Sequence, residues 1–208
     1  MAQPLGLSKD GYEVRFATIH LGHATLIKQL LPIMLTTAEQ PEADVRTIFL
    51  SSVGWRFRPN GGAQFLGLNT MQDFCILGPW RRYGQSQLAN IVYATELAHR
   101  YSNITTVSVH PGVVKTDLVG NLGLVDKAFV YAGNFGNVIA PQEDVLNHLW
   151  AATRSKKGTI ENGAFYMPAG IQSNSKLEST AKDHKLATEL WEWTEESAGR
   201  ALNVMIKT

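Results

Sequence analysis

Apolar residues at helical spacing near the start of the chain predict an amphipathic helix over Asp10 to Leu31. Its apolar face is formed by Phe16, Ile19, His23, Ile27 and Leu30. Several residues off that face are apolar as well, so this helix is expected to pack on two sides, one of them a second subunit. Pro32 stands where such a helix would end.

Two β-rich runs follow, "RTIFLSS" (46–52) and "ITTVSVHPG" (104–112), and an amphipathic stretch from Tyr83 to Tyr101 lies between them. This order predicts a β-α-β unit, which implies parallel strands joined by a right-handed crossover. Farther along, the pattern predicts a helix from Pro141 to about Arg154, a short strand in "NGAFYMP" (162–168) and a closing helix over Lys182 to Ala198.

Composition adds limits to this α/β pattern. With 208 residues, 44% hydrophobic, 18% charged and a net charge of +1, the chain is expected to be one globular domain. Neither a basic block nor a long apolar run is present, so nucleic acid and membranes are not expected partners, and the cytoplasm is the expected compartment. Cys75 is the only cysteine, and the six histidines show no paired zinc spacing, so no metal site is predicted.

The front of the chain differs from a doubly wound fold. Such folds begin with a strand and a glycine-rich turn that binds a pyrophosphate, whereas this chain begins with a loop and a helix. Its paired glycines, Gly61-Gly62 and Gly133 with Gly136, lack the required strand-turn-helix context.

Four segments resemble consecutive motifs of the short-chain dehydrogenases/reductases, in the retinol-dehydrogenase-like and fungal alcohol-dehydrogenase-like branch. They are "GYEVRFATIHLGHATLIKQLLP", "IFLSS", "YGQSQLANIVYATELAHRY" and "VSVHPGVVKTDL". The resemblance implies an α/β, truncated Rossmann-like (doubly wound) fold: a short parallel sheet flanked by helices, with 1–208 as one domain that lacks the glycine-rich front half. It therefore leads to the expectation that no cofactor binds.

Two of the four catalytic positions of that family are changed here. Ile19 stands at the position of the family's asparagine and Gln87 at that of its lysine, whereas Ser52 and Tyr83 remain. In the family the lysine holds the nicotinamide ribose and lowers the tyrosine pKa by its charge. A neutral amide supplies no charge, so Tyr83 is expected to act as a hydrogen-bond donor that forms an oxyanion hole with Ser52.

Three further groups of residues are candidates for this site. His110 follows a strand and is a candidate base, although the resemblance favours a packing role. Pro111, Gly112 and Thr116 match the positions that contact the nicotinamide end of a cofactor in the family. The long segment after Ser52 supplies candidate substrate contacts, which together with Gln87 are Trp55, Phe57 and Trp80. Its aromatic residues would otherwise cover bare sheet surface.

Three functions remain open. The first is a cofactor-independent enzyme, in which Tyr83 and Ser52 polarise a carbonyl of a small molecule for isomerisation, dehydration or cyclisation, for example in fungal specialised metabolism. The second is a noncatalytic dimerising or partner-binding pseudoenzyme. The third is an NADP(H)-dependent oxidoreductase whose N-terminus is missing from this chain. Retention of the helices at 10–31 and 83–101, which form the family's dimer interface, predicts a homodimer.

Overall fold

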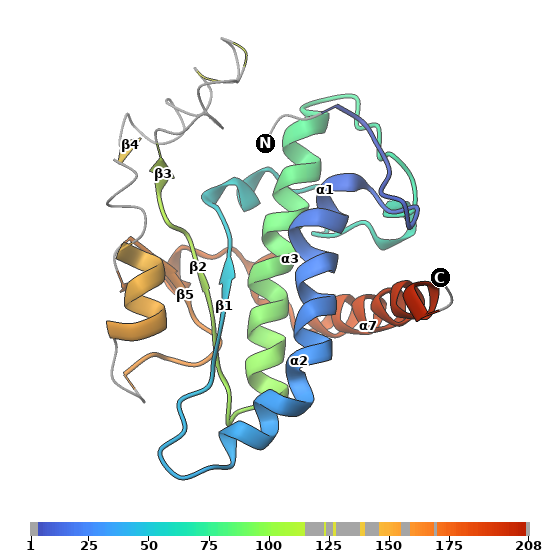
Figure 1. Ribbon diagram of the computed structural model, residues 1–208. Helices are drawn as coiled ribbons and strands as arrows, with labels where there is room; N and C mark the ends of the chain where they lie inside the picture. The colour runs from blue at the N-terminus through green and yellow to red at the C-terminus, as the bar shows by residue number, and fades with distance from the viewer. Residues whose placement is uncertain are drawn as a thin grey trace.

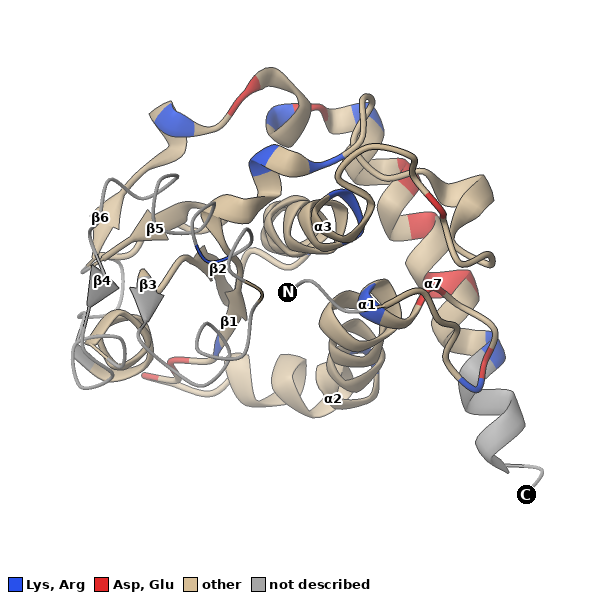
Figure 2. Cartoon of the chain, turned by 90° about the horizontal axis from the view of Figure 1, so that it is seen from above, with Lys and Arg blue, Asp and Glu red and all other residues tan. Residues whose placement is uncertain are grey.

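The computed structural model describes residues 4–114, 123, 127, 138–139, 146–154, 159–168 and 170–206. Its main sheet has the strand order β1-β2-β5-β6, of which Figure 1 labels the first three strands and Figure 2 all four. The strands are β1 (Arg46–Leu50), β2 (Thr105–Val109), β5 (Phe165–Met167) and β6 (Ile171–Gln172). The first three are parallel and β6 is antiparallel to β5. β3 (Val113–Val114) and β4 (Val138–Ile139) form a separate parallel pair.

The predicted β-α-β unit is confirmed, because β1 and β2 pair in parallel from Arg46↔Thr105 to Leu50↔Val109. β-branched and aromatic residues dominate both strands, which suits the pleated, largely buried surface of a parallel sheet. The α/β, Rossmann-like fold class is therefore also confirmed.

The helix predicted over Asp10 to Leu31 begins and ends later than expected. It consists of α1 (Val14–Phe16), a π-helical turn η1 (Ala17–Leu21) and α2 (Gly22–Ala38). It begins at Val14 because the Glu13 carboxylate caps it, accepting a hydrogen bond from the Phe16 amide at 2.8 Å. The predicted end at Pro32 was wrong, since α2 continues for six residues beyond it. A proline costs the helix one main-chain hydrogen bond, and packing on α7 (His184–Ile206) outweighs that cost.

The helix α3 (Gly78–Arg100) begins five residues before the predicted start at Tyr83. Leu77 precedes it in the left-handed conformation, with φ of 53°, and Pro79 occupies the first turn, where it loses no hydrogen bond. As a result Tyr83 lies in the second turn of the helix.

Four 3₁₀ turns and the end of the chain complete the described structure. The turns are η2 (Val53–Phe57), η3 (Phe65–Gly67), η5 (Asn174–Lys176) and η6 (Ser179–Lys182). Of the helix predicted from Pro141, residues 146–154 are helical and end in the π-helical η4 (Trp150–Arg154), whereas 141–145 lie outside the described residues. The closing helix α7 extends eight residues past the predicted Ala198.

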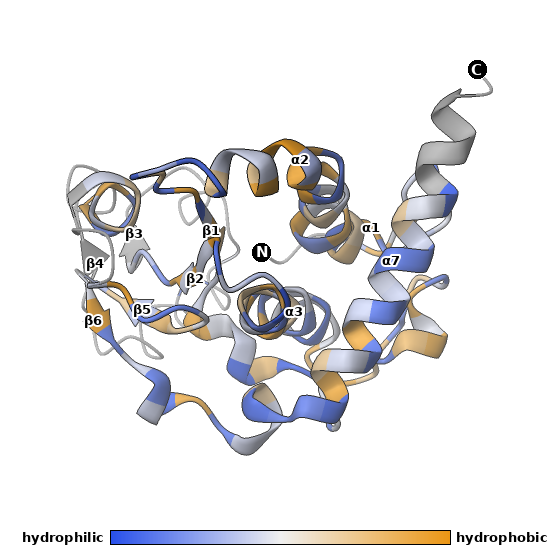
Figure 3. Ribbon diagram, turned by 90° about the horizontal axis from the view of Figure 1, so that it is seen from below, coloured by the Kyte–Doolittle hydropathy of each residue, from blue (hydrophilic) through white to orange (hydrophobic). Residues whose placement is uncertain are grey.

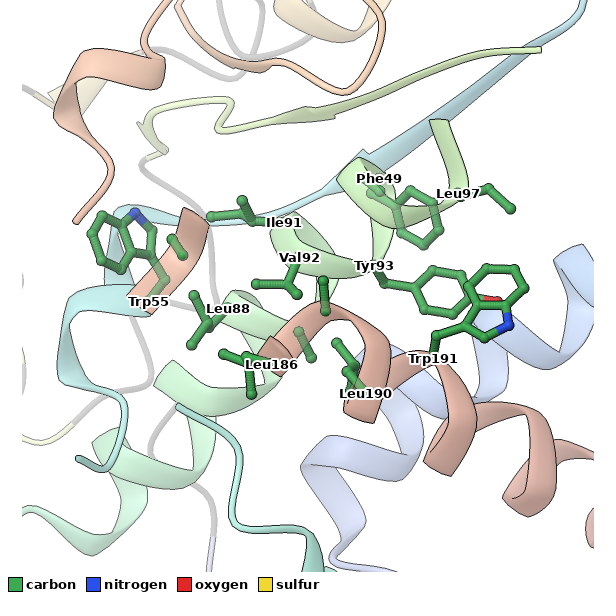
Figure 4. Close-up of a cluster of buried hydrophobic side chains, with 14 of the residues drawn as sticks. Phe49, Trp55, Leu88, Ile91, Val92, Tyr93, Leu97, Leu186, Leu190 and Trp191 are labelled. Carbon is green, nitrogen blue, oxygen red and sulfur yellow. The ribbon is translucent and has the colours of Figure 1, made fainter. Parts of the chain in front are cut away.

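The core surrounds α3, which packs on the sheet and on α7 (Figure 4). Tyr93 of α3 stacks on Trp191 of α7, with ring centroids 5.0 Å apart and planes 13° from parallel. Most of α3 is buried within the chain, so this helix offers little surface to a second subunit. The homodimer stays a prediction, and of its two proposed helices only α2 has an exposed side.

Candidate active site

Tyr83 lies against the turn η2, which follows the carboxyl end of β1. The approach is so close that a Cβ on Gly54 would fall 2.6 Å from Tyr83 Cε1. Trp80, one turn earlier on α3, meets the Tyr83 ring edge-to-face at a centroid distance of 6.3 Å. The glycine and the tryptophan together fix the ring of Tyr83 at the carboxyl end of the sheet.

A second glycine holds η2 against α3. A Cβ on Gly84 would meet only main-chain atoms, 2.5 Å from Arg58 N and 2.7 Å from Phe57 C. Because glycine has no side chain, the end of η2 rests directly on the helix backbone. This contact sets the distance between Ser52, which caps η2, and Tyr83.

The Tyr83 side chain is hydrogen-bonded to the side chains of Ser52 and Gln87. Burial raises the pKa of Tyr83 above its usual value, and the two hydrogen bonds oppose this rise only in part. Tyr83 is thus a neutral phenol at pH 7, as expected from the loss of the lysine charge.

Ser52 and its neighbour Ser51 have different roles. Ser52 Oγ accepts a hydrogen bond from the Gly54 amide at 3.1 Å, which caps η2 and aims the hydroxyl toward Tyr83. The buried Ser51 hydroxyl donates to the main-chain oxygen of Gln87 at 2.9 Å. It therefore ties the end of β1 to α3 one turn after Tyr83, and the repeated serine in "LSS" was the only signal for it in the sequence.

A buried network joins this region to the π-helical turn around Ile19. Asn90 donates from its amide nitrogen to the main-chain oxygens of Ile19 (3.1 Å) and Leu50 (2.8 Å), and its Oδ1 contacts His20 Nδ1 at 3.1 Å. His20 Nδ1 is therefore the donor, and its Nε2 accepts from the Thr194 hydroxyl at 3.0 Å. The π-helical turn, the end of β1, α3 and α7 are held together by these bonds. We did not identify Asn90 from the sequence.

Burial of His20 makes stability depend on pH. Burial lowers the His20 pKa from 6.5 to about 4, so the unfolded chain binds this proton at a higher pH than the folded protein. The free energy of unfolding therefore falls as the pH drops from about 6.5 toward about 4. When the pH is lowered from 7 to 5, the free energy of unfolding of the wild type should fall by about 2 kcal/mol more than that of His20→Gln. Urea unfolding at the two pH values measures this difference. Identical pH dependence of the two proteins would show that His20 is not buried as a neutral ring.

His110 is also buried, and burial together with the charge of Arg56 lowers its pKa to about 4. Its main chain is held on both sides, since its amide donates to Tyr166 O at 2.8 Å and its carbonyl accepts from Asn147 Nδ2 at 2.9 Å. A histidine with so low a pKa is a weak base. These contacts favour a packing role over catalysis.

The aromatic residues after Ser52 are mostly core. Trp55 is 1% exposed and Trp80 is 5% exposed, while the half-buried Phe57 packs on Trp80 at 5.8 Å between centroids. The guanidinium groups of Arg56 and Arg58 lie 5.4 and 5.2 Å from the centroid of the Trp55 ring. As candidate substrate contacts these side chains stay a prediction. Their burial shows that they also support η2.

The positions matched to the family's nicotinamide contacts are only partly described. Pro111 and Gly112 follow β2 at the same end of the sheet as Ser52, and Gly112 has a φ of 118° that favours glycine. Thr116 lies outside the described residues.

A cleft of about 340 Å³ lies at the other end of α3, lined by residues such as Glu96, His99 and Asp183. Thirteen residues of helix separate Glu96 from Tyr83, roughly 20 Å along the axis. Asp183 accepts hydrogen bonds from the first amides of α7, with Lys185 N at 2.9 Å. The cleft is thus distinct from the Tyr83 site, and one of its acidic residues, Asp183, caps the helix α7.

A parallel sheet with a helical crossover, and with hydroxyl side chains at its strand ends, defines a Rossmann-like α/β protein. The chain is 29% identical over 208 residues to a short-chain dehydrogenase/reductase of Aspergillus calidoustus, covering 94% of this chain and 64% of that protein. It is 33% identical over 204 residues to an uncharacterized oxidoreductase of Schizosaccharomyces pombe, covering 93% of this chain and 57% of that protein. A solved structure of an uncharacterized protein from Mycobacterium paratuberculosis matches with a TM-score of 0.63 at 26% identity, and the match covers 96% of this chain and 63% of that protein.

The chain belongs to the short-chain dehydrogenase/reductase family, in its retinol-dehydrogenase-like branch. No family model matches it. It spans about three-fifths of the length of the curated relatives named above. Among the described helices none is both long enough and apolar enough to cross a membrane, and the cytoplasmic location stays a prediction.

This kinship corrects one expectation. The relatives are named dehydrogenases, reductases and oxidoreductases, enzymes that exchange hydride with a redox cofactor, NAD(P)H in this family. The expectation that no cofactor binds was therefore wrong. It rested on the absence of a glycine-rich turn from a chain that covers only about three-fifths of the length of these relatives.

Proposed function

We propose that the chain forms the carbonyl-binding end of an NAD(P)(H)-linked oxidoreductase site. The observation that carries this proposal is the Tyr83 hydroxyl, held by Ser52 and Gln87 at the carboxyl end of the sheet. Two hydroxyl groups at one point can donate to a carbonyl oxygen and stabilise the negative charge that develops there on reduction. The substrate class is therefore an aldehyde or ketone, or the corresponding alcohol in the reverse direction.

The residues present fit the nicotinamide end of such a cofactor. Gln87 Oε1 is buried and has no hydrogen-bond partner in the described part of the chain. A sugar hydroxyl is a donor that would satisfy this oxygen, while the Gln87 amide nitrogen stays on Tyr83. When bound, the nicotinamide nucleotide supplies hydride chemistry.

The chain's own residues supply the proton. Tyr83 is a neutral phenol with a raised pKa, so it donates a hydrogen bond to the carbonyl oxygen and then the proton as the alcohol forms. Ser52 has one hydroxyl proton, so it donates the second hydrogen bond by turning that proton from Tyr83 to the carbonyl oxygen, which orients the substrate. Because Gln87 carries no charge, Tyr83 is a weaker acid than a tyrosine beside a lysine.

The test is oxidation of NADPH and NADH by the purified protein with a panel of aldehydes and ketones. Carbonyl-dependent oxidation of either nucleotide supports the proposal. Absence of turnover in both the wild type and Gln87→Lys would overturn it.

Gln87→Lys is expected to raise the turnover number about tenfold, because a nearby cation lowers the pKa of Tyr83 and makes it a better proton donor. Gln87→Met is the matched control, since it has a similar volume and no charge. It is expected to stay at or below the wild-type rate. Equal rates for the lysine and methionine variants would show that charge at position 87 does not act on Tyr83.

A further inference from the structure

The chain contains two Asn-Gly pairs, Asn60-Gly61 and Asn162-Gly163. In such a pair the main-chain nitrogen of the glycine can attack the side-chain amide of the asparagine and convert it to an acid. The attack is easiest before glycine, because glycine has no side chain to obstruct the approach and its main chain rotates most freely. Both asparagines are exposed, so access to water does not distinguish the two pairs. Their hydrogen bonds do distinguish them.

The pair Asn162-Gly163 is held by main-chain bonds at the start of β5. Asn162 Oδ1 accepts a hydrogen bond from Thr106 N at 2.7 Å, and Gly163 N donates to Thr106 O at 2.7 Å. The Gly163 carbonyl accepts from the Thr95 hydroxyl at 3.0 Å. Thr95 belongs to α3, and β5 lies between α3 and β6 in the view of Figure 3. The nitrogen that would attack and the amide that it would attack are therefore both bonded to β2.

The pair Asn60-Gly61 lies in a turn after η2, where neither reacting group is held. One main-chain bond closes this turn, from Gly62 N to Pro59 O at 3.1 Å, and it uses neither Gly61 N nor the Asn60 side chain. These two groups have no hydrogen-bond partner among the residues that the structure describes. A Cβ on Gly61 would meet nothing within 4 Å, so the pair also has room to change conformation.

Gly62 anchors the far end of the turn. It is buried, and a Cβ there would fall 2.7 Å from Leu186 Cδ2 and 3.3 Å from Thr180 Cγ2. Gly61 and Gly62 have φ values of 81° and 93°, which favour glycine. The turn is thus fixed to the core at Gly62 and unrestrained at Asn60. A chemical change at Asn60 therefore leaves the fold of the chain intact.

We propose that Asn60 is a site of spontaneous deamidation in the folded protein, whereas Asn162 is protected. The Gly61 nitrogen loses its proton and bonds to Asn60 Cγ, while the bond between Cγ and Nδ2 breaks and Nδ2 leaves as ammonia. The product is a five-membered succinimide ring. One water molecule then opens this ring. Opening at Cγ gives aspartate, and opening at the main-chain carbonyl carbon of residue 60 gives isoaspartate.

Deamidation at Asn60 changes the charge of the whole chain. The formal net charge falls from +1 to 0, because a neutral amide becomes a carboxylate. A protein with a net charge near zero associates and precipitates more readily. In the isoaspartate form the main chain is also one carbon longer between Pro59 and Gly61. The modified protein is therefore more acidic and less soluble, although it stays folded.

The test is incubation of the purified full chain at mildly alkaline pH, followed by peptide mass spectrometry at successive times. The peptide with Asn60 should change from amide to acid at least about tenfold faster than the peptide with Asn162, because two hydrogen bonds must break before Asn162 reacts. In concentrated guanidinium chloride the fold is lost, and the two rates should become similar. Neither readout depends on catalysis, so this test is independent of the proposed function.

Variants assign the change in charge to one residue. On isoelectric focusing the incubated wild type should develop an acidic band, and Asn60→Gln should not, because glutamine closes the larger ring more slowly. Asn69→Gln is the matched control, since Asn69 is also exposed in a turn but precedes threonine. It should develop the band as the wild type does. Three results would overturn the proposal: equal or faster reaction at Asn162 in the folded protein, unequal rates that persist in guanidinium chloride, or an acidic band that persists in Asn60→Gln.

Discussion

Replacing Tyr83 with phenylalanine is expected to lower NAD(P)H-linked carbonyl reduction by about 100- to 10,000-fold, the range for loss of a positioned proton donor. The substitution removes only the hydroxyl. The ring keeps its contacts with Gly54 and Trp80, so the fold and the position of η2 should not change. The measurement is the steady-state rate at saturating carbonyl substrate, together with a thermal unfolding curve to confirm that stability is retained.

Tyr93→Phe is the matched control for this prediction. Tyr93 lies on the same helix and is also buried, but it stacks on Trp191 in the core, roughly 15 Å along the helix axis from Tyr83. Its loss of a hydroxyl is expected to leave the turnover number unchanged. A Tyr83→Phe protein that keeps more than about a third of the wild-type rate would remove Tyr83 from the reaction, because a proton donor contributes far more than that.

Gly84→Ala is expected to destabilise the protein by about 1–3 kcal/mol or more, although alanine is the better helix former by about 1 kcal/mol. The new Cβ would lie 2.5 Å from Arg58 N and 2.9 Å from Gly54 O, and these main-chain atoms cannot rotate away. The strain is relieved only if η2 moves off α3, which also separates Ser52 from Tyr83. Urea unfolding measures the first effect and the carbonyl reduction rate the second.

Gly199→Ala provides the control, because Gly199 lies in the helix α7 and a Cβ there would meet nothing within 4 Å. This variant should be as stable as the wild type or more stable by about 1 kcal/mol. The opposite signs of the two glycine variants would show that close approach, and not helix propensity, determines the residue at position 84. A stable Gly84→Ala would mean that η2 does not rest on α3.

Features that depend on local spacing could be predicted from the sequence. The pairing of β1 with β2 followed from two β-rich runs with a helix between them, and the relation of Tyr83 to Gln87 followed from their four-residue separation. Both predictions depend only on the regular side-chain repeat of a helix or a strand.

Features that depend on tertiary contact could not be predicted in this way. Pro32 looked like a helix end, but α7 packs beside α2 and the helix continues. Gly54 and Gly84 are separated by thirty residues, and only the folded chain shows that both serve the same contact between η2 and α3. Asn90 is one polar residue among many on a helix until its three partners come together.

The expectation that no cofactor binds failed for a different reason. The sequence lacks a glycine-rich turn, and this absence led to the expectation of a cofactor-free protein. Kinship with dehydrogenases contradicts that expectation, because the chain covers only about three-fifths of these relatives and its motifs report on that part alone. The changed residue Gln87 is better evidence about chemistry, since it touches Tyr83 directly.

The proposed site is tested most directly by the ionisation of Tyr83, followed by NMR of ¹³C-labelled tyrosine with Tyr83→Phe to assign the signal. The wild-type pKa of Tyr83 is expected to lie above the usual 10 of tyrosine, because burial outweighs the hydrogen bonds from Ser52 and Gln87. In Gln87→Lys the pKa of Tyr83 is expected to be lower than in the wild type. A Tyr83 pKa below 10 in the wild type, or the same pKa in both proteins, would contradict the hydrogen-bonded site on which the proposed function rests.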